Sequence, residues 1–321
     1  MDYYGKPVVV ISSCLGFKPC RYNGQMLKDK FVDELRNFID FVDICPETQI
    51  GLEIPRQPIR LISEQNNIIV YEPKSQKEYT KEMLIFSDDF LKKLSKVDGF
   101  ILKGRSPSCG IKDVKIYLNR EKGAACFKGR GVFADRVITK YTYLAIEEEG
   151  RLTNFRIREH FLTKLYIMYR FRMVTESGSI AQLVNFQANN KYLLMAYHQR
   201  EQKLLERIVA QYDKQPFNKV IDEYREHLKI AFARLPRSAN IINSLTHIME
   251  HFSDNLSSKE KEFILDSFNK YKDEKFPLSV PINILKTYAI KYEKQYLINQ
   301  TIWCPYPEEL MSISDTDKHC N

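Results

Sequence analysis

The chain has 321 residues, of which 44% are hydrophobic, so it is long enough to bury one large core or two ordinary ones. The sequence contains no apolar run of about eighteen residues, and its first residues lack the pattern of a secretory signal. Seven cysteines in such a chain argue against a disulfide framework and favour metal or redox chemistry. We therefore expect a soluble, globular, cytoplasmic protein.

The formal net charge is +8, and the positive excess lies in the middle of the chain. Residues 151–237 contain 16 Lys and Arg against 8 Asp and Glu. A concentrated basic region attracts phosphate groups more strongly than the same charge spread evenly. We therefore expect this region to contact a nucleic acid.

Residues 1–150 alternate short apolar runs with longer amphipathic ones. The runs PVVVISSCL, VDICP and DGFILKG are typical of buried strands, and QMLKDKFVDELRNFIDF and IFSDDFLKKLSKV are typical of helices. Gly129 and Gly131 precede a further short helical segment. This order predicts a three-layer α/β domain with a mostly parallel sheet, ending near Gly150.

In residues 151–321 the apolar spacing changes to three and four, which is typical of amphipathic helices. Ser257 and Ser258, with a glutamate close behind, predict a helix N-cap. Pro277 and Pro281 are expected to separate the last two helices. The second part of the chain is therefore predicted to be an all-α helical domain.

Three cysteines follow the three predicted strands: Cys14, Cys45 and Cys109. The carboxyl ends of neighbouring parallel strands form the usual ligand site of an open α/β sheet, so these thiols can meet there. Thiolates select zinc, copper(I) or iron–sulfur clusters, and the spacing typical of zinc fingers is absent. The spacing alone is explained equally well by three cysteines buried as small apolar residues.

Glu47 lies two residues after Cys45, so an extended segment would place both side chains on one side. A carboxylate beside a desolvated site is a candidate general acid or base. Ser106 and Ser108 precede Cys109 and are candidates to orient a substrate carbonyl, although each alone is more typical of a turn cap. The cysteines that lack a strand-end setting, and that we expect not to bind metal, are Cys20, Cys126, Cys304 and Cys320.

Four segments resemble the thiouracil desulfidase family (domain of unknown function 523): ISSCLGFKPCRYNGQ, CPETQIGLEIPRQPIRLI, GFILKGRSPSCG and GRGVFADRV. The resemblance covers about the first 150 residues. The segments NNKYLLMAYHQREQKLLERIVA, NIINSLTHIMEHF, PLSVPINILKTY and YLINQTIWCPYPEEL resemble the YbgA-type domain of unknown function 1722. Fusions of these two domains resemble the tRNA 4-thiouridine desulfidases.

The resemblance implies a [4Fe-4S] cluster held by Cys14, Cys45 and Cys109, whose fourth iron binds the thiocarbonyl sulfur of the substrate. Asn23 stands where the family pattern has an aspartate, so one negative charge is missing here. The residues that match the catalytic positions of the family are Glu47, Ser106 and Ser108.

The basic region favours a thiolated tRNA over a small thiolated base as the substrate, because only the tRNA has phosphates that basic residues can contact. Aromatic side chains lie among the basic ones and can stack exposed bases. A charged, aromatic helical segment is also typical of a solvated helix face over a core. The candidate nucleic-acid-binding residues are Arg151, Arg156, Arg158, Lys164, Lys191, Arg200, Lys203 and Arg207.

The sequence therefore predicts a [4Fe-4S]-dependent desulfidase that converts 4-thiouridine in tRNA to uridine and sulfide, with residues 1–150 carrying the cluster and residues 151–321 binding tRNA. One alternative is desulfuration of a free thiolated nucleobase, with the helical domain serving oligomerisation. The other is a non-enzymatic iron–sulfur or zinc module that senses redox state and binds nucleic acid.

Overall fold

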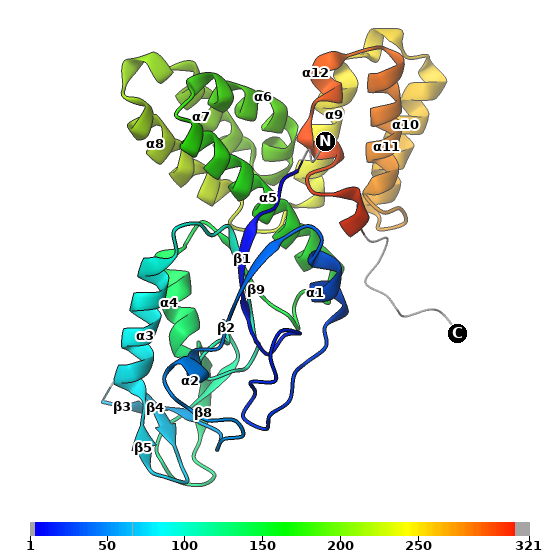
Figure 1. Cartoon of the computed structure of the whole chain (residues 1–321). Coiled ribbons are helices and arrows are strands. Elements are labelled where there is room, and N and C mark those ends of the chain that lie inside the picture. The colour runs from blue at the N-terminus through cyan, green and yellow to red at the C-terminus, as the bar shows by residue number, and fades with distance from the viewer. Residues whose placement is uncertain (1–3, 66, 312–321) are drawn as a thin grey trace. The chain divides into compact units, whose positions relative to one another are not determined.

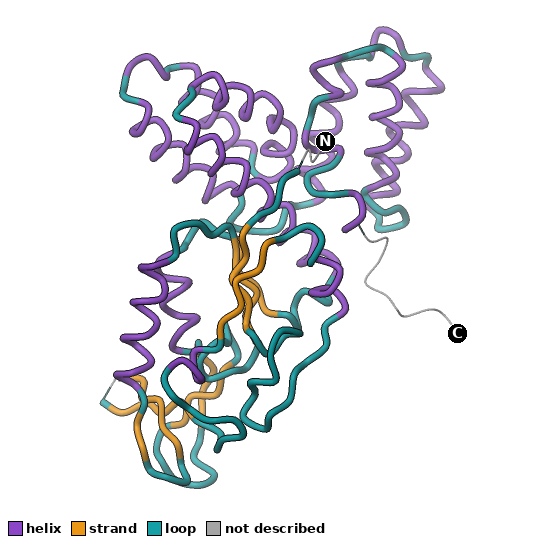
Figure 2. Tube along the Cα trace, in the orientation of Figure 1, coloured by secondary structure: helices purple, strands orange, loops and turns teal. Residues whose placement is uncertain are grey.

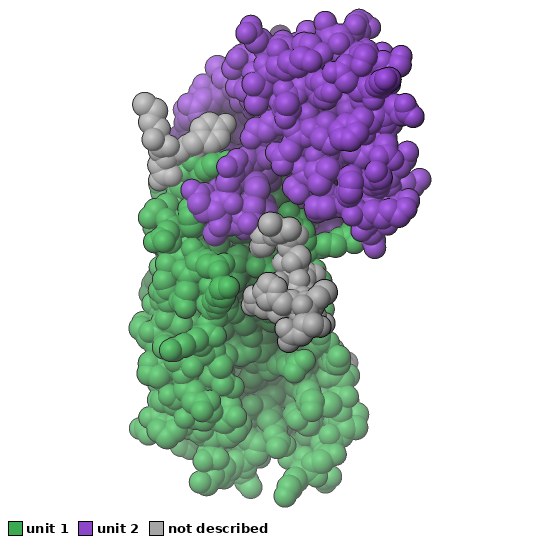
Figure 3. Space-filling view, turned by 90° about the vertical axis from the view of Figure 1, so that its right-hand side faces the viewer, with its two compact units in different colours: residues 1–165, 315–321 green, residues 166–314 purple. Residues whose placement is uncertain are grey.

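The computed structural model describes residues 4–65 and 67–311 (Figure 1). The described residues divide into two compact units, those up to residue 165 and those from 166 to 311, which Figure 3 colours separately. The division falls inside helix α5 (Phe155–Ser177), beyond the boundary expected near Gly150. Among the described residues, every strand lies in the first unit (Figure 2).

The first sheet has four strands in the order β2-β1-β6-β9, and all of its pairs are parallel. Its strands are β1 (Val8–Ser12), β2 (Asp40–Ile44), β6 (Gly99–Leu102) and β9 (Ala145–Glu148). The three strands predicted from apolar runs are all present and are neighbours. Their carboxyl ends therefore lie at one edge of the sheet.

Helices cover both faces of this sheet, which confirms the predicted α/β class. Figure 1 shows α1 (Lys30–Leu35) on one side and α3 (Thr80–Lys93) and α4 (Val132–Lys140) on the other. Helix α1 is shorter than the predicted segment, because Asp29 caps its start and residues 40 and 41 pair with β1 instead.

A second sheet of five strands, in the order β5-β4-β3-β7-β8, was not predicted. Within it only β3 and β7 run parallel, and the other pairs are antiparallel. The strands are β3 (Arg60–Glu64), β4 (Asn67–Glu72), β5 (Lys77–Glu78), β7 (Val114–Tyr117) and β8 (Cys126–Gly129).

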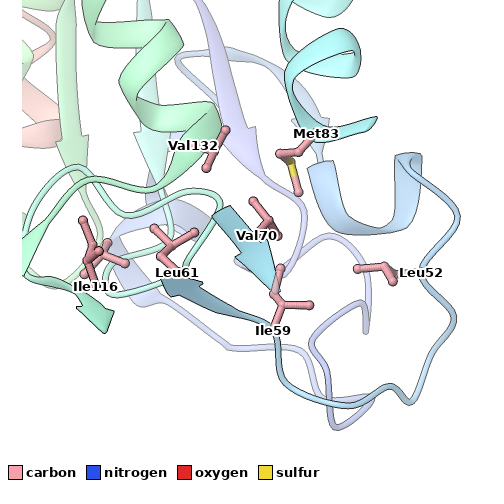
Figure 4. Close-up of a cluster of buried hydrophobic side chains, with 8 residues drawn as sticks. Leu52, Ile59, Leu61, Val70, Met83, Ile116 and Val132 are labelled. Atoms are coloured by element: carbon pink, nitrogen blue, oxygen red, sulfur yellow. The ribbon is translucent and has the colours of Figure 1, made fainter. Parts of the chain in front are cut away.

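One face of the second sheet is buried by helices α3 and α4. Leu61, Val70 and Ile116 from its strands form a hydrophobic cluster with Met83 of α3 and Val132 of α4 (Figure 4). Residues that alternate with these along the strands point to the opposite face. That opposite face carries several of the charged residues considered below.

The second unit is helical, as predicted. After α5 its helices are α6 (Ile180–Tyr197), α7 (Gln199–Ala210), α8 (Phe217–Ala231), α9 (Ser238–Glu250), α10 (Ser258–Lys272), α11 (Ser279–Lys291) and α12 (Gln295–Ile298). In the described part of the chain, no helix combines the length and the apolar character needed to cross a membrane.

The starts of helices α10 and α11 lie at two positions that carried a sequence signal. The predicted N-cap is confirmed: Ser257 and Glu260 form a capping box at the start of α10. Pro277 does precede α11, but Pro281 lies inside its first turn rather than between helices. A proline is tolerated there because backbone N–H groups of the first turn have no partner within the helix.

Replacing Ser257 by Ala should lower the free energy of unfolding by about 1 kcal/mol, because the first turn of α10 loses its cap. Urea denaturation followed by circular dichroism measures this loss. Ser258→Ala, at the first helical position, serves as the control and should change stability less. Equal losses in the two variants would show that the capping box contributes nothing.

Candidate active site

A cavity of about 350 Å³ lies where strands β1, β2 and β6 end, and all three predicted cysteines line it. Cys14 follows β1, Cys45 follows β2 as the N-cap of α2 (Pro46–Gln49), and Cys109 lies in the loop after β6. The structure thus brings Cys14, Cys45 and Cys109 to one place, because parallel neighbouring strands carry them there.

A fourth thiol, that of Cys20, lines the same cavity, although Cys20 does not follow a predicted strand and was expected not to bind metal. Cys20 is only 4% exposed, and Cys45 Sγ donates to its backbone carbonyl at 3.9 Å. The chain turns back after β1 through Gly16, whose φ of 84° is a left-handed conformation that favours glycine. The glycine between Cys14 and Cys20 was the available signal.

Two further cysteines among the described residues do not line this cavity. Cys126 is exposed on β8, and Cys304 lies in the second unit. Cys320 lies outside the described residues.

The thiols of Cys20, Cys45 and Cys109 hold their protons strongly. Burial raises the pKa of Cys109 to about 12, against hydrogen bonds from Ser12 and Ser108 that lower it. The hydrogen bond with Cys14 raises the pKa of Cys20 to about 11, and the bond with Cys20, together with burial, raises the pKa of Cys45. Metal binding requires thiolates, so it would release protons from this cavity.

The four thiols that line the cavity suit an iron–sulfur cluster, because soft thiolates are the ligands of such clusters. Within residues 4–65 and 67–311, no three His, Cys, Asp or Glu side chains are arranged to hold one ion. Tetrahedral zinc ligands lie about 2.3 Å from the metal and so about 3.8 Å from one another. Cysteines that hold a cluster each bind a different iron and lie farther apart, and soft thiolates suit iron–sulfur chemistry.

A buried ion pair forms one wall of the cavity. Arg56 Nη2 lies 2.5 Å and Nε 3.0 Å from Glu47 Oε2, and the two side chains are only 6% and 12% exposed. Ser108 Oγ donates to Glu47 Oε1 at 2.8 Å. Glu47 is thus held by a charged donor on one oxygen and by a hydroxyl on the other.

Arg56 was not predicted as a site residue. Its Nη1 also donates to the carbonyl of Cys20 at 3.1 Å, and its backbone N–H donates to the carbonyl of Tyr22 at 2.7 Å. Its side chain therefore ties the segment of Cys20 to Glu47. The only sequence signal was an arginine in the short PRQP stretch, which does not reveal a partner nine residues earlier.

The two serines have different settings. Ser106 Oγ accepts the backbone N–H of Ser108 at 3.3 Å and that of Cys109 at 3.2 Å, as a turn cap does. Ser108 is buried, and its Oγ lies 3.7 Å from Cys109 Sγ as well as within hydrogen-bond distance of Glu47. Ser106 holds the turn, while Ser108 connects the carboxylate to a thiol.

The loop that carries Cys109 is fixed by two carboxylates near the end of β9. Glu149 accepts the backbone N–H of Gly104 at 2.7 Å, and Glu148 accepts that of Ile111 at 2.7 Å. A Cβ at Gly131 would lie 2.5 Å from the carbonyl oxygen of Ser108, so glycine allows the next segment to pack against this loop. The position of Cys109 is therefore set by contacts on both sides.

Among the predicted RNA contacts of the first unit, Arg156 is exposed, and Arg151 forms an ion pair with Glu147. The guanidinium of Arg158 lies 5.2 Å from the centre of the Phe31 ring. Lys164 is partly buried, and burial lowers its pKa to about 8. None of these four residues lines the cavity.

In the second unit, Arg200, Lys203 and Arg207 are exposed at a spacing of three and four on α7, so they share one helix face. Lys191 forms an ion pair with Glu206 at 3.4 Å. The role of these residues in RNA binding stays a prediction. Asn23 is exposed, donates to Gln25 Oε1 at 2.8 Å and does not line the cavity.

Comparison with known proteins agrees with the resemblance seen in the sequence. Residues 9–149 match the family model of 2-thiouracil desulfurase, and residues 191–307 match that of DUF1722, a protein family of unknown function. The first region of the chain is therefore similar to 2-thiouracil desulfurases, and the second is similar to DUF1722 proteins.

Two individual proteins are similar to part of the chain. An uncharacterized protein of Bacillus subtilis (strain 168), YbbK, is 29% identical over an alignment of 111 residues, and the match covers 32% of this chain and 73% of YbbK. The solved structure of a [4Fe-4S]-dependent thiouracil desulfidase, TudS, aligns with 46% of this chain and 93% of its own, at 24% identity and a TM-score of 0.35.

Replacing Arg56 by Met should lower the free energy of unfolding by about 3–5 kcal/mol, because Glu47 would remain buried without its partner. The double variant Arg56→Met, Glu47→Leu should recover much of this loss, since no lone charge is left. Urea denaturation at pH 7 measures both.

Arg120→Met is the matched control for this experiment. Arg120 pairs with Glu64 and Glu78, but its side chain is 39% exposed, so its loss should matter far less. If Arg56→Met were no more destabilising than Arg120→Met, the ion pair at the cavity would not be an organising contact.

Proposed function

We propose that this protein is a [4Fe-4S]-dependent desulfidase that removes sulfur from 4-thiouridine in tRNA, giving uridine and sulfide. The observation that carries the proposal is the cavity at the strand ends, where four thiols face a buried, hydrogen-bonded carboxylate. The match of residues 9–149 to the family model of 2-thiouracil desulfurase supports the same reaction type. Cys14, Cys45 and Cys109 are the proposed cluster ligands.

The reaction is a hydrolysis: water replaces the thiocarbonyl sulfur at carbon, the sulfur leaves as hydrogen sulfide, and no electrons are transferred. A cluster held by three cysteines supplies one iron without a protein ligand, a soft Lewis acid that prefers sulfur to oxygen. The protein itself must deliver the water and move its protons.

Glu47 is the group that accepts the proton of the attacking water. Its ion pair with Arg56 holds one carboxyl oxygen, and the hydrogen bond from Ser108 fixes the direction of the other. A positioned general base contributes typically ~10²- to 10⁴-fold to a rate. Ser106 caps the turn, and its Oγ also lies 3.0 Å from Ser108 Oγ, so it extends the hydrogen-bonded chain that reaches Glu47.

Two features favour tRNA over a free base as the substrate. Residues 151–237 concentrate positive charge, and α7 presents Arg200, Lys203 and Arg207 on one exposed face. A small thiolated base would need neither. Desulfuration of a free thiolated base is the second candidate, because the matched family is named for 2-thiouracil.

Glu47→Gln should reduce kcat by ~10²- to 10⁴-fold and leave the iron content unchanged, because the amide keeps the shape of the side chain but cannot accept the proton. Sulfide release from thiolated tRNA under anaerobic conditions measures kcat, and a colorimetric assay measures iron. Wild-type kcat in this variant would exclude Glu47 as the base.

Single replacement of Cys14, Cys45 or Cys109 by Ala should remove most of the iron and the absorption of the cluster, because each is proposed to bind a different iron. Cys126→Ala, at an exposed position, is the control and should keep both. Cys20→Ala should also keep them, because three ligands suffice. Full iron in any one of the first three variants would remove that residue from the site, whereas iron loss in Cys20→Ala would make Cys20 a ligand.

Thiolated tRNA and free thiouracil, each incubated with anaerobically reconstituted protein, separate the candidate functions. We expect sulfide from the tRNA at a much higher kcat/KM than from the free base. Sulfide from the free base alone would contradict the tRNA proposal. Retained metal without sulfide from either substrate would favour a non-enzymatic binding module.

A further inference from the structure

A second cavity, of about 460 Å³, adjoins the thiol-lined one in the first unit. Both cavities are lined by Pro58, Ile59, Arg105 and Pro107, so these residues form a shared wall. We call the second cavity the basic groove. Its further lining residues include Arg60, Asp113, Lys115, Tyr117 and Lys128.

The basic groove uses the face of the second sheet that points away from the core. Leu61 and Ile116 are paired neighbours in the register and are buried in the core cluster. Arg60 and Lys115 directly precede them on strands β3 and β7, so they point to the opposite face. This face is therefore positively charged along its middle strands.

The positive charges of the basic groove lie close enough together to destabilise the sheet. Lys115 and Lys128 lie directly opposite each other on β7 and β8, an arrangement in which like charges repel. Asp113 lies 2.8 Å from Lys128 and neutralises one of the cations. Arg60 and Arg105 add two more, so the groove keeps a clear positive excess. Folding alone gives no reason for that excess.

The groove also contains an aromatic ring. The guanidinium of Arg60 lies 5.1 Å from the centre of the partly exposed Tyr117 ring. Arginines that stack on aromatic rings can still donate to phosphate oxygens. Aromatic rings beside such cations are what protein grooves use to bind single-stranded nucleic acid.

Arg105 joins the two cavities. It is exposed, it lines both, and its φ of 60° is unusual for a residue other than glycine. The segment that delivers Cys109 therefore places a cation on the shared wall. A substrate that fills the thiol-lined cavity and continues past Arg105 enters the basic groove.

We propose that the basic groove binds the RNA segment that flanks the thiolated nucleotide, with its phosphates at Arg60, Lys115 and Lys128. This inference rests on the proposed tRNA desulfidase function and adds a contact surface in the first unit to the basic residues predicted in residues 151–237. A free base, a nucleoside or a mononucleotide is too small to use it.

The test compares two double variants with the same change of charge. The groove variant combines Lys115→Gln with Lys128→Gln. The control variant combines Lys92→Gln with Lys93→Gln on α3, where both lysines are exposed and line neither cavity. Removing Lys115 and Lys128 relieves a repulsion, so the variant should fold. Each cluster-loaded protein is assayed with thiolated tRNA, 4-thiouridine and its 5′-monophosphate.

We expect the groove variant to raise KM for tRNA with little change in kcat, and to leave the two small substrates unaffected. The slope of log K for tRNA binding against log salt should fall in magnitude by about 1.4 to 1.8, the contribution of two phosphate contacts. The control variant should resemble wild type in all of these measurements.

If wild type desulfurates tRNA but the groove variant behaves like the control variant, the groove proposal is wrong and the proposed function stands. If tRNA and the monophosphate are affected equally, the groove binds one phosphate and no flanking segment, which also overturns the proposal. If wild type releases sulfide from 4-thiouridine and neither binds nor desulfurates tRNA, the tRNA function fails and the groove proposal fails with it.

Discussion

The buried ion pair of Arg56 and Glu47 is the contact on which the cavity depends. Through it, α2 is connected to the segment of Cys20, and the hydrogen bond from Ser108 connects the same carboxylate to the loop of Cys109. Buried charges are stable only when they are paired and hydrogen-bonded. The ion pair and its hydrogen bonds therefore hold three segments together. The thiols keep their positions because these segments do.

The parts of the site that could be predicted are those set by strand order. Cys14, Cys45 and Cys109 each follow an apolar run, and parallel neighbouring strands necessarily place such residues at one edge. The α/β class and the helical second part could be predicted from the spacing of apolar residues. These patterns are local, so one sequence suffices to see them.

The parts that could not be predicted depend on contacts between segments far apart in the chain. Arg56 contacts Glu47 because the segment after α2 folds back. The carbonyl of Cys20 lies beside the thiol of Cys45 because the chain turns at Gly16. The second sheet joins β3 to β7 across more than 50 residues, and its strands are short and half-exposed, so their apolar pattern is weak. The pairing of Lys115 with Lys128 is likewise invisible before the register is known.

The proposed chemistry requires water as the source of the new oxygen and no exchange of electrons. The most direct measurement is single-turnover desulfuration of thiolated tRNA in water enriched in oxygen-18, without reductant or oxidant, followed by mass spectrometry of the product nucleoside and assay of sulfide. The account predicts one labelled oxygen in each uridine formed and an equal amount of sulfide. Unlabelled uridine, or sulfide release that depends on an added reductant, would contradict it.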